Sequence, residues 1–291
     1  MTLTHLHTAA RTARRMVAAT AALLMVAGCS AAHNGPPDTD ETAGQTLRVG
    51  IKYNQPGIGL MDGDKTPTGF DVDVAAYIAW KLGYSPYDIE WVRASTGDRE
   101  TLLLNDEVDM VVASYTITDE RRGQIDFAGP YLTVGQDIMV RADNTTITGP
   151  EGLAGKIACE PPLSANTTRL KDLLGDKVTI IEERNYLECA RHVVDGTADA
   201  TSTDDFILAG LAATDELFGQ VRLLGVQLSE DQWGIGLPKG SHDVCVAVNE
   251  ALTEMVEDGS WQRFIDRHTG GTDYKPSEYK NPPALTPCAM D

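Results

Sequence analysis

The chain has 291 residues and a formal net charge of -19, with 43 acidic side chains against 24 basic ones. A surface this acidic argues against nucleic acid and anionic lipid as binding partners. The length is sufficient for two compact lobes.

The N-terminal segment 1–28 is expected to be a targeting signal. Its arginines precede an apolar run over residues 16–27, which is too short to cross a bilayer as a helix. The sequence Val26-Ala27-Gly28-Cys29 that follows indicates a bacterial lipobox. We expect Cys29 to be lipidated, which would tether the protein to the cell membrane on its extracytoplasmic face. The alternative is an ordinary signal peptide followed by a chance cysteine.

Residues 29–45 show no apolar periodicity. They are small, polar and acidic, and they include Pro36-Pro37. We therefore expect a flexible tether between the anchor and the folded part of the chain.

Strand-like and helical patterns alternate in the first part of the folded region. Strands are expected at Leu47–Lys52, Ile89–Val92 and Met110–Ser114, and helices at Asp71–Leu82 and Asp98–Leu104. This alternation is typical of parallel βαβ units.

The same rhythm restarts after Gly149, which predicts a second α/β lobe. The strands and helices expected there are residues 156–159, 166–174, 178–182, 186–194, 200–203 and 206–213. A later strand, 233–237, and two helical stretches have no strand series of their own, so we expect them to return to the first lobe.

The predicted fold is therefore α/β with two lobes. Lobe 1 is expected to comprise residues 46–141 and 232–291, and lobe 2 residues 142–231. The chain would cross between them twice, near residues 140–144 and 225–232.

Three motifs occur in a fixed order along the chain. They are Gly69-Phe70-Asp71-Val72-Asp73-Val74 with its continuation to Leu82, then residues 113–121 (ASYTITDER), and then residues 198–205 (ADATSTDD). In this order and spacing they resemble the family 3 solute-binding proteins, the extracytoplasmic receptors of polar amino acid ABC importers, over residues 46–270. The resemblance is strongest to the glutamate-binding lipoproteins of high-GC Gram-positive bacteria. It implies a periplasmic-binding-protein-like fold of type II with two hinge crossings.

Arg121 is the predicted contact for the α-carboxylate of an amino acid. It follows Thr118-Asp119-Glu120, which predicts a helix start at the carboxyl edge of a parallel sheet. Its planar fork suits a carboxylate. The resemblance implies that Thr116 assists Arg121 and that the Ser114 carbonyl faces the ammonium. The alternative is that Arg121 neutralises neighbouring acids on a solvated face.

The resemblance places the ammonium-binding acid at Asp204, directly after an expected strand, with Asp205 as the rival. A buried acid at this position needs a charged partner, because its desolvation would otherwise be costly. The resemblance also places a hydroxyl contact at Ser164. Here the chain departs from the family's glycine-rich turn, because Pro161 and Pro162 offer no N–H group to a ligand.

Lys52, Thr96 and Arg99 are expected to select the side chain of the ligand. The resemblance places Lys52 where receptors for acidic amino acids carry a basic residue, and Thr96 and Arg99 match a second basic site. Two cations in one cavity repel each other unless an anion lies between them. The expected ligand is therefore glutamate, with aspartate as a second. The alternative is that Lys52 and Arg99 are exposed and pair with surface acids.

Four cysteines remain besides Cys29. An even number in an exported protein implies disulfides, and four cysteines allow three pairings. Cys159 and Cys189 both fall in the expected lobe 2, and Cys245 and Cys288 both fall in the expected lobe 1, so we expect those two bonds. Free buried thiols are the alternative. No pair of Cys or His has metal-ligand spacing, and we expect neither a metal nor a cofactor.

The expected function is that of a monomeric, non-catalytic receptor that delivers glutamate to the permease subunits of an ABC transporter. One alternative is a sensory receptor for a membrane kinase regulator. Another is a cyclohexadienyl-dehydratase-like enzyme on the same fold. The sequence shows no nucleophile elbow, metal triad or phosphate loop in favour of an enzyme.

Overall fold

The computed structural model describes residues 45–290 except 64, 270–273 and 275–279. The expected signal and Cys29 lie outside these residues, as does the tether apart from Gln45. Within the described residues, no helix has both the length and the apolar character needed to cross a membrane.

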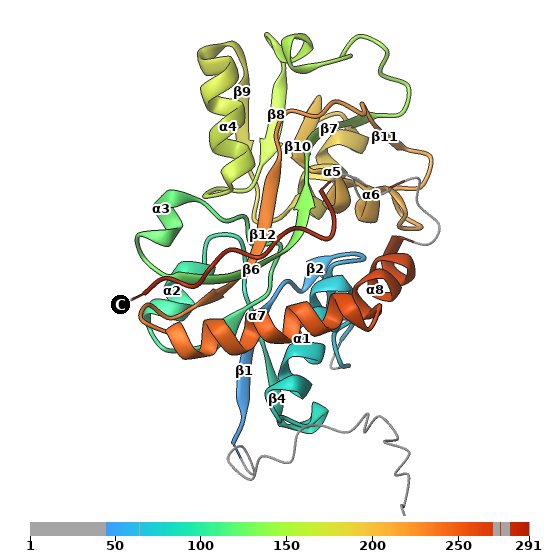
Figure 1. The fold of residues 1–291 in the computed structure, drawn as a ribbon. Helices are drawn as coiled ribbons and strands as arrows, with labels where there is room; N and C mark the ends of the chain where they lie inside the picture. The colour runs from blue at the N-terminus through green and yellow to red at the C-terminus, as the bar shows by residue number, and fades with distance from the viewer. Residues whose placement is uncertain (1–44, 64, 270–273, 275–279, 291) are drawn as a thin grey trace, which may run out of the picture. The chain divides into compact units, whose positions relative to one another are not determined.

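The first sheet has five strands in the order β4-β1-β5-β12-β6 (Figure 1). The strands are β1 (Leu47–Ile51), β4 (Ile89–Arg93), β5 (Met110–Val111), β6 (Asp126–Val134) and β12 (Asp231–Leu237). β1 pairs in parallel with β4 and β5, whereas β12 runs antiparallel to β5 and β6. Every residue of β6 is buried, as expected for a strand that is covered on both faces.

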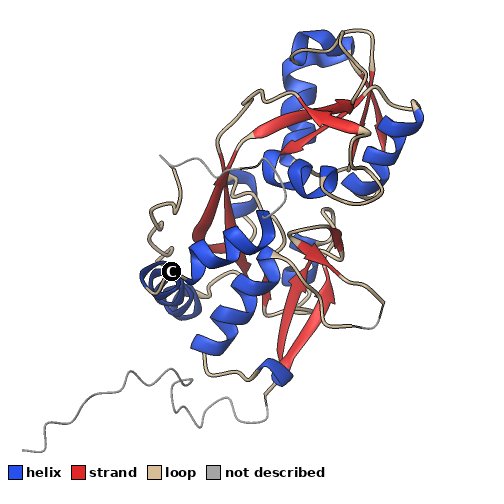
Figure 2. Cartoon of the chain, turned by 90° about the vertical axis from the view of Figure 1, so that its right-hand side faces the viewer, coloured by secondary structure: helices blue, strands red, loops and turns tan. Residues whose placement is uncertain are grey.

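Helices cover the first sheet (Figure 2). The helical elements of this part are α1 (Phe70–Lys81), η1 (Pro86–Asp88), α2 (Arg99–Leu104), α3 (Asp119–Arg122), α7 (His242–Glu257) and α8 (Ser260–Thr269), and a short hairpin comprises β2 (Asn54–Gln55) and β3 (Gly59–Leu60). α1 packs against α7 and α8. Before α1, a Cβ atom on Gly69 would lie 2.2 Å from the carbonyl oxygen of Ile58, so this position of the first motif requires glycine.

The second sheet also has five strands, in the order β11-β7-β10-β8-β9. The elements of this part are β7 (Gln136–Arg141), η2 (Pro150–Leu153), β8 (Ile157–Glu160), α4 (Ala165–Leu174), η3 (Gly175–Lys177), β9 (Thr179–Glu182), α5 (Tyr186–Asp195), β10 (Ala200–Asp204), α6 (Asp205–Ala212) and β11 (Val221–Leu223). β8 is parallel to β9 and β10, and β7 is antiparallel to β10 and β11. The side chains of Ser164 and Asn185 cap the starts of α4 and α5.

The chain passes from the first sheet to the second at Gly135, between β6 and β7. The first crossing was expected near residues 140–144, which is too late, because Gln136–Arg141 pairs with β10 and β11 in the second sheet. The physical reason is that residues 126–140 are buried without interruption, including the polar Gln136 and Asp137, so no exposed segment marks the boundary. The return crossing lies between β11 and β12.

Both expected disulfides are present. Cys159 of β8 bonds to Cys189 of α5, with a Cα–Cα distance of 5.1 Å. Cys245 of α7 bonds to Cys288, with a Cα–Cα distance of 5.9 Å. Each bond closes a loop within the described chain and is expected to stabilise the fold by about 2–4 kcal/mol.

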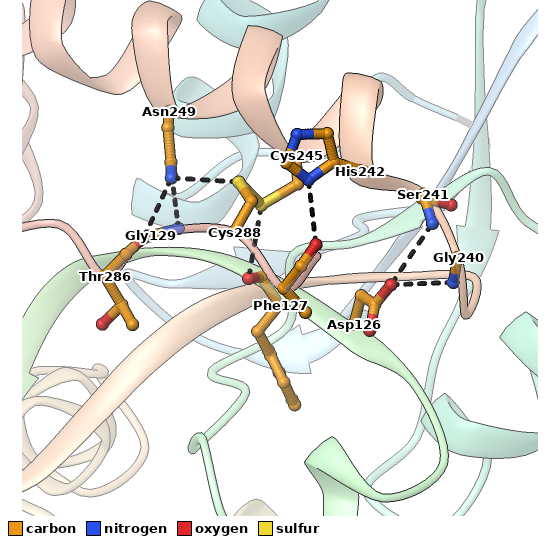
Figure 3. The surroundings of a disulfide bond; sticks show 11 residues. Asp126, Phe127, Gly129, Gly240, Ser241, His242, Cys245, Asn249, Thr286 and Cys288 are labelled. Carbon is orange, nitrogen blue, oxygen red and sulfur yellow. Dashed lines mark hydrogen bonds between the residues drawn. A yellow bond between two sulfur atoms is a disulfide. The ribbon is translucent and has the colours of Figure 1, made fainter. Parts of the chain in front are cut away.

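The segment that contains Cys288 is also held by hydrogen bonds (Figure 3). Asn249 of α7 accepts from Gly129 N at 2.7 Å and donates to Thr286 O at 3.1 Å. Asn281 pairs with both backbone groups of Thr133, at 2.8 and 2.7 Å. The segment therefore lies along β6, the edge strand of the first sheet.

Candidate functional site

Side chains from both sheets and their helices line one small cavity. Its lining comprises Gln55, Thr96, Arg99, Ser114, Thr116, Ser164, Ala165, Asn166, Tyr186, Thr203, Asp204 and Ile207. The space in which the centre of a water molecule fits is about 10 Å³, which is roughly enough for one water. Of the predicted contacts, all except Lys52 and Arg121 line this cavity.

Seen from the cavity, Lys52 lies behind Thr96. Lys52 follows β1 in the chain. Its side chain is buried, and its Nζ donates to Thr96 Oγ1 at 2.8 Å. Burial lowers the pKa of Lys52 well below its usual value, and the charges of Arg99 and Arg121 lower it further. Lys52 thus reaches the cavity through the hydroxyl group of Thr96.

Arg99 is 3% exposed, and among the described residues its guanidinium donates only to backbone carbonyls. The acceptors are the oxygens of Thr96, Ala113 and Ser114, at 3.0 to 3.2 Å. Burial, and then the charge of Arg121, lower the pKa of Arg99 to about 10, so it stays charged at neutral pH. Among the described residues neither Arg99 nor Lys52 has an acidic ion-pair partner. The alternative that both are exposed and paired with surface acids is therefore wrong.

The backbone N–H of Ser114 binds a buried acid of the first motif. Ser114 has a φ of +44°, and its N–H donates to Asp71 Oδ2 at 2.6 Å. Asp71 is fully buried and also accepts from the Tyr131 hydroxyl at 2.7 Å, and burial raises its pKa to about 6. The Ser114 hydroxyl donates to Gln55 Oε1 at 2.9 Å. Asp71 therefore connects the first motif to the wall of the cavity.

Arg121 lies beside the cavity and lines the cleft next to it. Its guanidinium donates to Glu100 Oε1 at 2.9 Å, to Thr116 O at 2.7 Å and to Leu163 O at 3.2 Å. Its acidic partner is thus Glu100, not one of the acids next to it in the sequence. A guanidinium has five N–H groups. Two of them are left by these bonds for the carboxylate of a ligand.

Both arginines lie over the ring of Tyr115. Its centroid is 4.3 Å from Arg99 Cζ and 5.1 Å from Arg121 Cζ. The negative face of an aromatic ring attracts a cation, so the ring favours the charged form of both arginines. Tyr115 belongs to the second motif, but motif matching alone gave no reason to assign it a role.

Asp204 is the acid of the cavity. It ends β10 and is 1% exposed. Its Oδ1 accepts from Asn166 Nδ2 at 2.9 Å and its Oδ2 from Trp233 Nε1 at 2.7 Å. Burial, followed by the charge of Asp231, raises the pKa of Asp204 to about 7. Each oxygen retains a lone pair that can accept from an ammonium.

Asp205, the rival of Asp204, has a different environment. Its Oδ1 accepts from Gly135 N at 3.3 Å and from Phe206 N at 2.8 Å. Asp205 therefore binds the backbone of the first crossing and does not line the cavity.

The loop that departs from the family pattern faces Arg121 with a carbonyl group. Leu163 has a φ of +59°, and its oxygen accepts from Arg121. Ser164 lines the cavity, and its Oγ lies 2.7 Å from the Tyr186 hydroxyl. At the start of the loop, Glu160 is fully buried and accepts from Ser202 N at 2.7 Å. Among the described residues, no group of three or more His, Cys, Asp or Glu side chains could hold a metal ion.

Comparisons with known proteins were made for the whole chain. The family model described as bacterial extracellular solute-binding proteins, family 3, matches residues 47–271. The chain is similar to the glutamate-binding protein GluB of Corynebacterium efficiens, with 34% identity over 88% of this chain and 91% of that protein. It is also similar to GluB of Corynebacterium glutamicum, with 36% identity over 77% of this chain and 79% of that protein.

Solved structures show the same fold. An ancestral arginine-binding protein bound to arginine matches with a TM-score of 0.72 and 30% identity, covering 77% of this chain and 98% of that one. The GluR0 ligand-binding core from Nostoc punctiforme in complex with L-glutamate matches with a TM-score of 0.67 and 27% identity, covering 76% of this chain and 98% of that one. The named relatives are amino acid-binding proteins rather than enzymes. The predicted two-lobed α/β fold is confirmed.

Proposed function

This chain belongs to the bacterial extracellular solute-binding proteins of family 3, and from that premise we propose that it binds L-glutamate, with L-aspartate as a second ligand, and delivers it to the permease of an ABC transporter. The GluB relatives, which are named for glutamate binding, support this choice of ligand. The solved arginine-bound relative makes a cationic amino acid the competing choice. The charges around the cavity favour glutamate.

The observation that carries the proposal is a pair of buried basic side chains that have no acidic ion-pair partner among the described residues. Arg99 lines the cavity and Lys52 lies directly behind Thr96. Their hydrogen-bond partners in the described chain are neutral oxygens, so a nearby anion would stabilise the charged form of each side chain. A cationic side chain at this end of the cavity would be repelled, whereas the side-chain carboxylate of glutamate would supply the missing anion.

Groups in the cavity and beside it offer partners for the α-carboxylate and the ammonium of the ligand. The free N–H groups of Arg121 and the Thr116 hydroxyl suit the α-carboxylate, and Asp204 suits the ammonium. Asn166 and Trp233 hold the carboxylate of Asp204 in place. These contacts are common to all α-amino acids, so they provide affinity but no choice of side chain.

Binding on this proposal requires the cleft to open and close. An amino acid is much larger than the present cavity, so the two sheets must separate for it to enter. Contacts that cross between the lobes then stabilise the closed form. They include the bond from Arg121 to Leu163 and the packing of Phe206 against Phe70, with ring centroids 5.5 Å apart. A permease that recognises the closed form would select the loaded receptor.

The proposed location is the extracytoplasmic face of the cell membrane, with the protein tethered as a monomer through lipidated Cys29. The support for this is the lipobox after an apolar run that is too short to span a bilayer. The polar stretch up to residue 45 would give the folded part freedom to reach the permease.

Calorimetric titration of the purified protein against all the protein amino acids tests the function. We expect L-glutamate or L-aspartate to bind tightest, and lysine and arginine not to bind. Tightest binding of a cationic amino acid would contradict the role given to Lys52 and Arg99.

A further inference from the structure

The hydroxyl of Thr96 lies between Lys52 and the cavity. Lys52 is 2% exposed, and its Nζ lies 2.8 Å from Thr96 Oγ1. Thr96 lines the cavity and Lys52 does not. In the described part of the chain, Thr96 is the hydrogen-bond partner of this amine, and no carboxylate lies within ion-pair distance of it.

The direction of this hydrogen bond depends on the protonation of Lys52. A charged ammonium can only donate, so Thr96 Oγ1 accepts, and the Thr96 hydroxyl proton is left to point into the cavity. A neutral amine has a lone pair and can accept that proton instead. The oxygen of Thr96 would then offer a lone pair to the cavity. The protonation state of Lys52 therefore decides whether Thr96 presents a donor or an acceptor to the ligand.

We propose that Lys52 takes up a proton when an acidic side chain enters the cavity, and that this proton switches Thr96 from an acceptor suited to an amide into a donor suited to a carboxylate. The inference rests on the proposed glutamate-binding function and deepens it. An ionised carboxylate only accepts hydrogen bonds, whereas the NH₂ group of glutamine only donates them. The Lys52–Thr96 pair is thus a proton-linked selector between glutamate and glutamine.

The charged groups around Lys52 come from several elements. Arg99 of α2 and Arg121 of α3 disfavour its charged form, and Asp71 of α1 and Asp98 before α2 favour it. Burial is the largest influence, and the pKa of Lys52 lies well below its usual value. A ligand carboxylate beside Thr96 would be a further anion close to the amine, and would raise that pKa on binding.

Asp204 contributes a second proton exchange that must be separated from that of Lys52. Every amino acid brings its ammonium to Asp204, which favours the ionised carboxylate and releases a proton. Because the pKa of Asp204 is about 7, this release becomes small at a pH of about 8.5. Uptake by Lys52 depends on the ligand side chain, so it distinguishes glutamate from glutamine.

Calorimetric titration with L-glutamate at a pH of about 8.5, in buffers of different ionisation enthalpy, counts the protons taken up on binding. We expect a net uptake of at most about one proton for glutamate and little for glutamine. Lys52→Arg is the matched control, because a guanidinium stays charged at this pH. Glutamate binding to this variant is expected to take up no proton. As the pH rises through the titration of Lys52, the ratio of glutamate to glutamine affinity is expected to fall in the native protein by up to about tenfold per pH unit.

NMR of lysine labelled at Cε gives a readout that does not depend on ligand affinity. The Lys52 signal, assigned by its loss in Lys52→Arg, is expected to titrate at a lower pH in the free protein than in the glutamate complex. Glutamate binding without proton uptake, together with a Lys52 that is charged in both states, would overturn this inference and leave the receptor function standing. Failure of every acidic amino acid to bind would instead remove the proposed function itself.

Discussion

Trp233 donates a hydrogen bond of 2.7 Å from Nε1 to Oδ2 of Asp204. Trp233 lies on β12 of the first sheet and Asp204 ends β10 of the second. The acid proposed to hold the ligand ammonium is thus positioned by a donor from the opposite sheet. The ammonium site is complete only when the two lobes are together, which connects ligand binding to closure.

Arg121 and Asp204 are proposed to bind the α-carboxylate and the ammonium, which all α-amino acids share. Removal of either side chain should therefore abolish the binding of every ligand. Loss of one partner of a buried charge pair typically costs about 2–5 kcal/mol, because the other charge is left without solvent. Arg121→Ala and Asp204→Ala are therefore expected to lose glutamate, aspartate and glutamine equally in calorimetric titrations. Selective loss of binding for one ligand would show that these residues contact the side chain of the ligand.

Removal of the cations at the side-chain end should have a different effect. In Lys52→Gln and Arg99→Gln, glutamate binding is expected to fall by about 1–3 kcal/mol, the worth of a hydrogen bond to a charged group. Glutamine needs no cation there, so its binding should fall much less or improve. Equal losses for both ligands, measured side by side, would mean that these residues do not read the side-chain carboxylate.

Gly210 of α6 is a test of closure that touches no ligand contact. A Cβ atom at Gly210 would lie 2.2 Å from the carbonyl oxygen of Pro56, which follows β2 in the first lobe. Gly210→Ala is therefore expected to weaken the binding of all ligands by about 1–3 kcal/mol, because the closed form is overpacked. Gly97→Ala is the matched control, since its Cβ would meet only Leu163 Cδ1, at 3.5 Å.

Small-angle X-ray scattering with saturating glutamate provides the structural readout for these two variants. Gly97→Ala should become as compact as the native protein, whereas Gly210→Ala should remain more extended. If Gly210→Ala reached full compaction and bound glutamate with native affinity, the close approach of Gly210 to Pro56 would not be needed for closure.

The ligand-free protein should lose stability as the pH rises through the titration of Asp204. Its pKa is about 7 in the folded chain, against an ordinary value of 3.8. The folded state therefore binds the proton more tightly, so stability is greatest below about pH 4 and declines until about pH 7. A shift of this size corresponds to about 4 kcal/mol.

Asp204→Asn does not titrate and provides the reference for this measurement. Urea unfolding of both proteins at several pH values should show the native protein losing stability relative to Asp204→Asn between pH ~4 and pH ~7. Asp71, whose pKa is about 6, is present in both proteins, so its contribution cancels. A stability difference between the two proteins that does not vary with pH would show that the pKa of Asp204 is not raised in the folded protein.

The alternation of apolar runs was enough to predict the two lobes, because parallel βαβ units impose that rhythm on any chain. The boundary between them was not predictable from the same signal. β6 and β7 are both buried up to Val140, and only Gly135 separates them. The polar residues next to the crossing, Gln136 and Asp137, are buried within β7, so they do not mark an exposed connection. Strand pairing, which is not local in the sequence, decides which sheet each strand joins.

The predicted ligand contacts mostly line one cavity, but their supporting partners were not visible in the sequence. Asp71 begins the helix expected at Asp71–Leu82, and its carboxylate binds Ser114 and Tyr131. Its position among buried residues of α1 was the available signal, because an acid on an apolar face needs a partner. Glu100 and Tyr115 reach the arginines only through the folded backbone. Such contacts cannot be read from spacing along the chain.

A crystal structure of the complex with L-glutamate is the most direct measurement of the central claim. We expect the side-chain carboxylate of glutamate to contact Thr96 and Arg99, the α-carboxylate to contact Arg121, and the ammonium to contact Asp204. A ligand bound in the opposite direction, with its side-chain carboxylate away from Arg99, would contradict the claim.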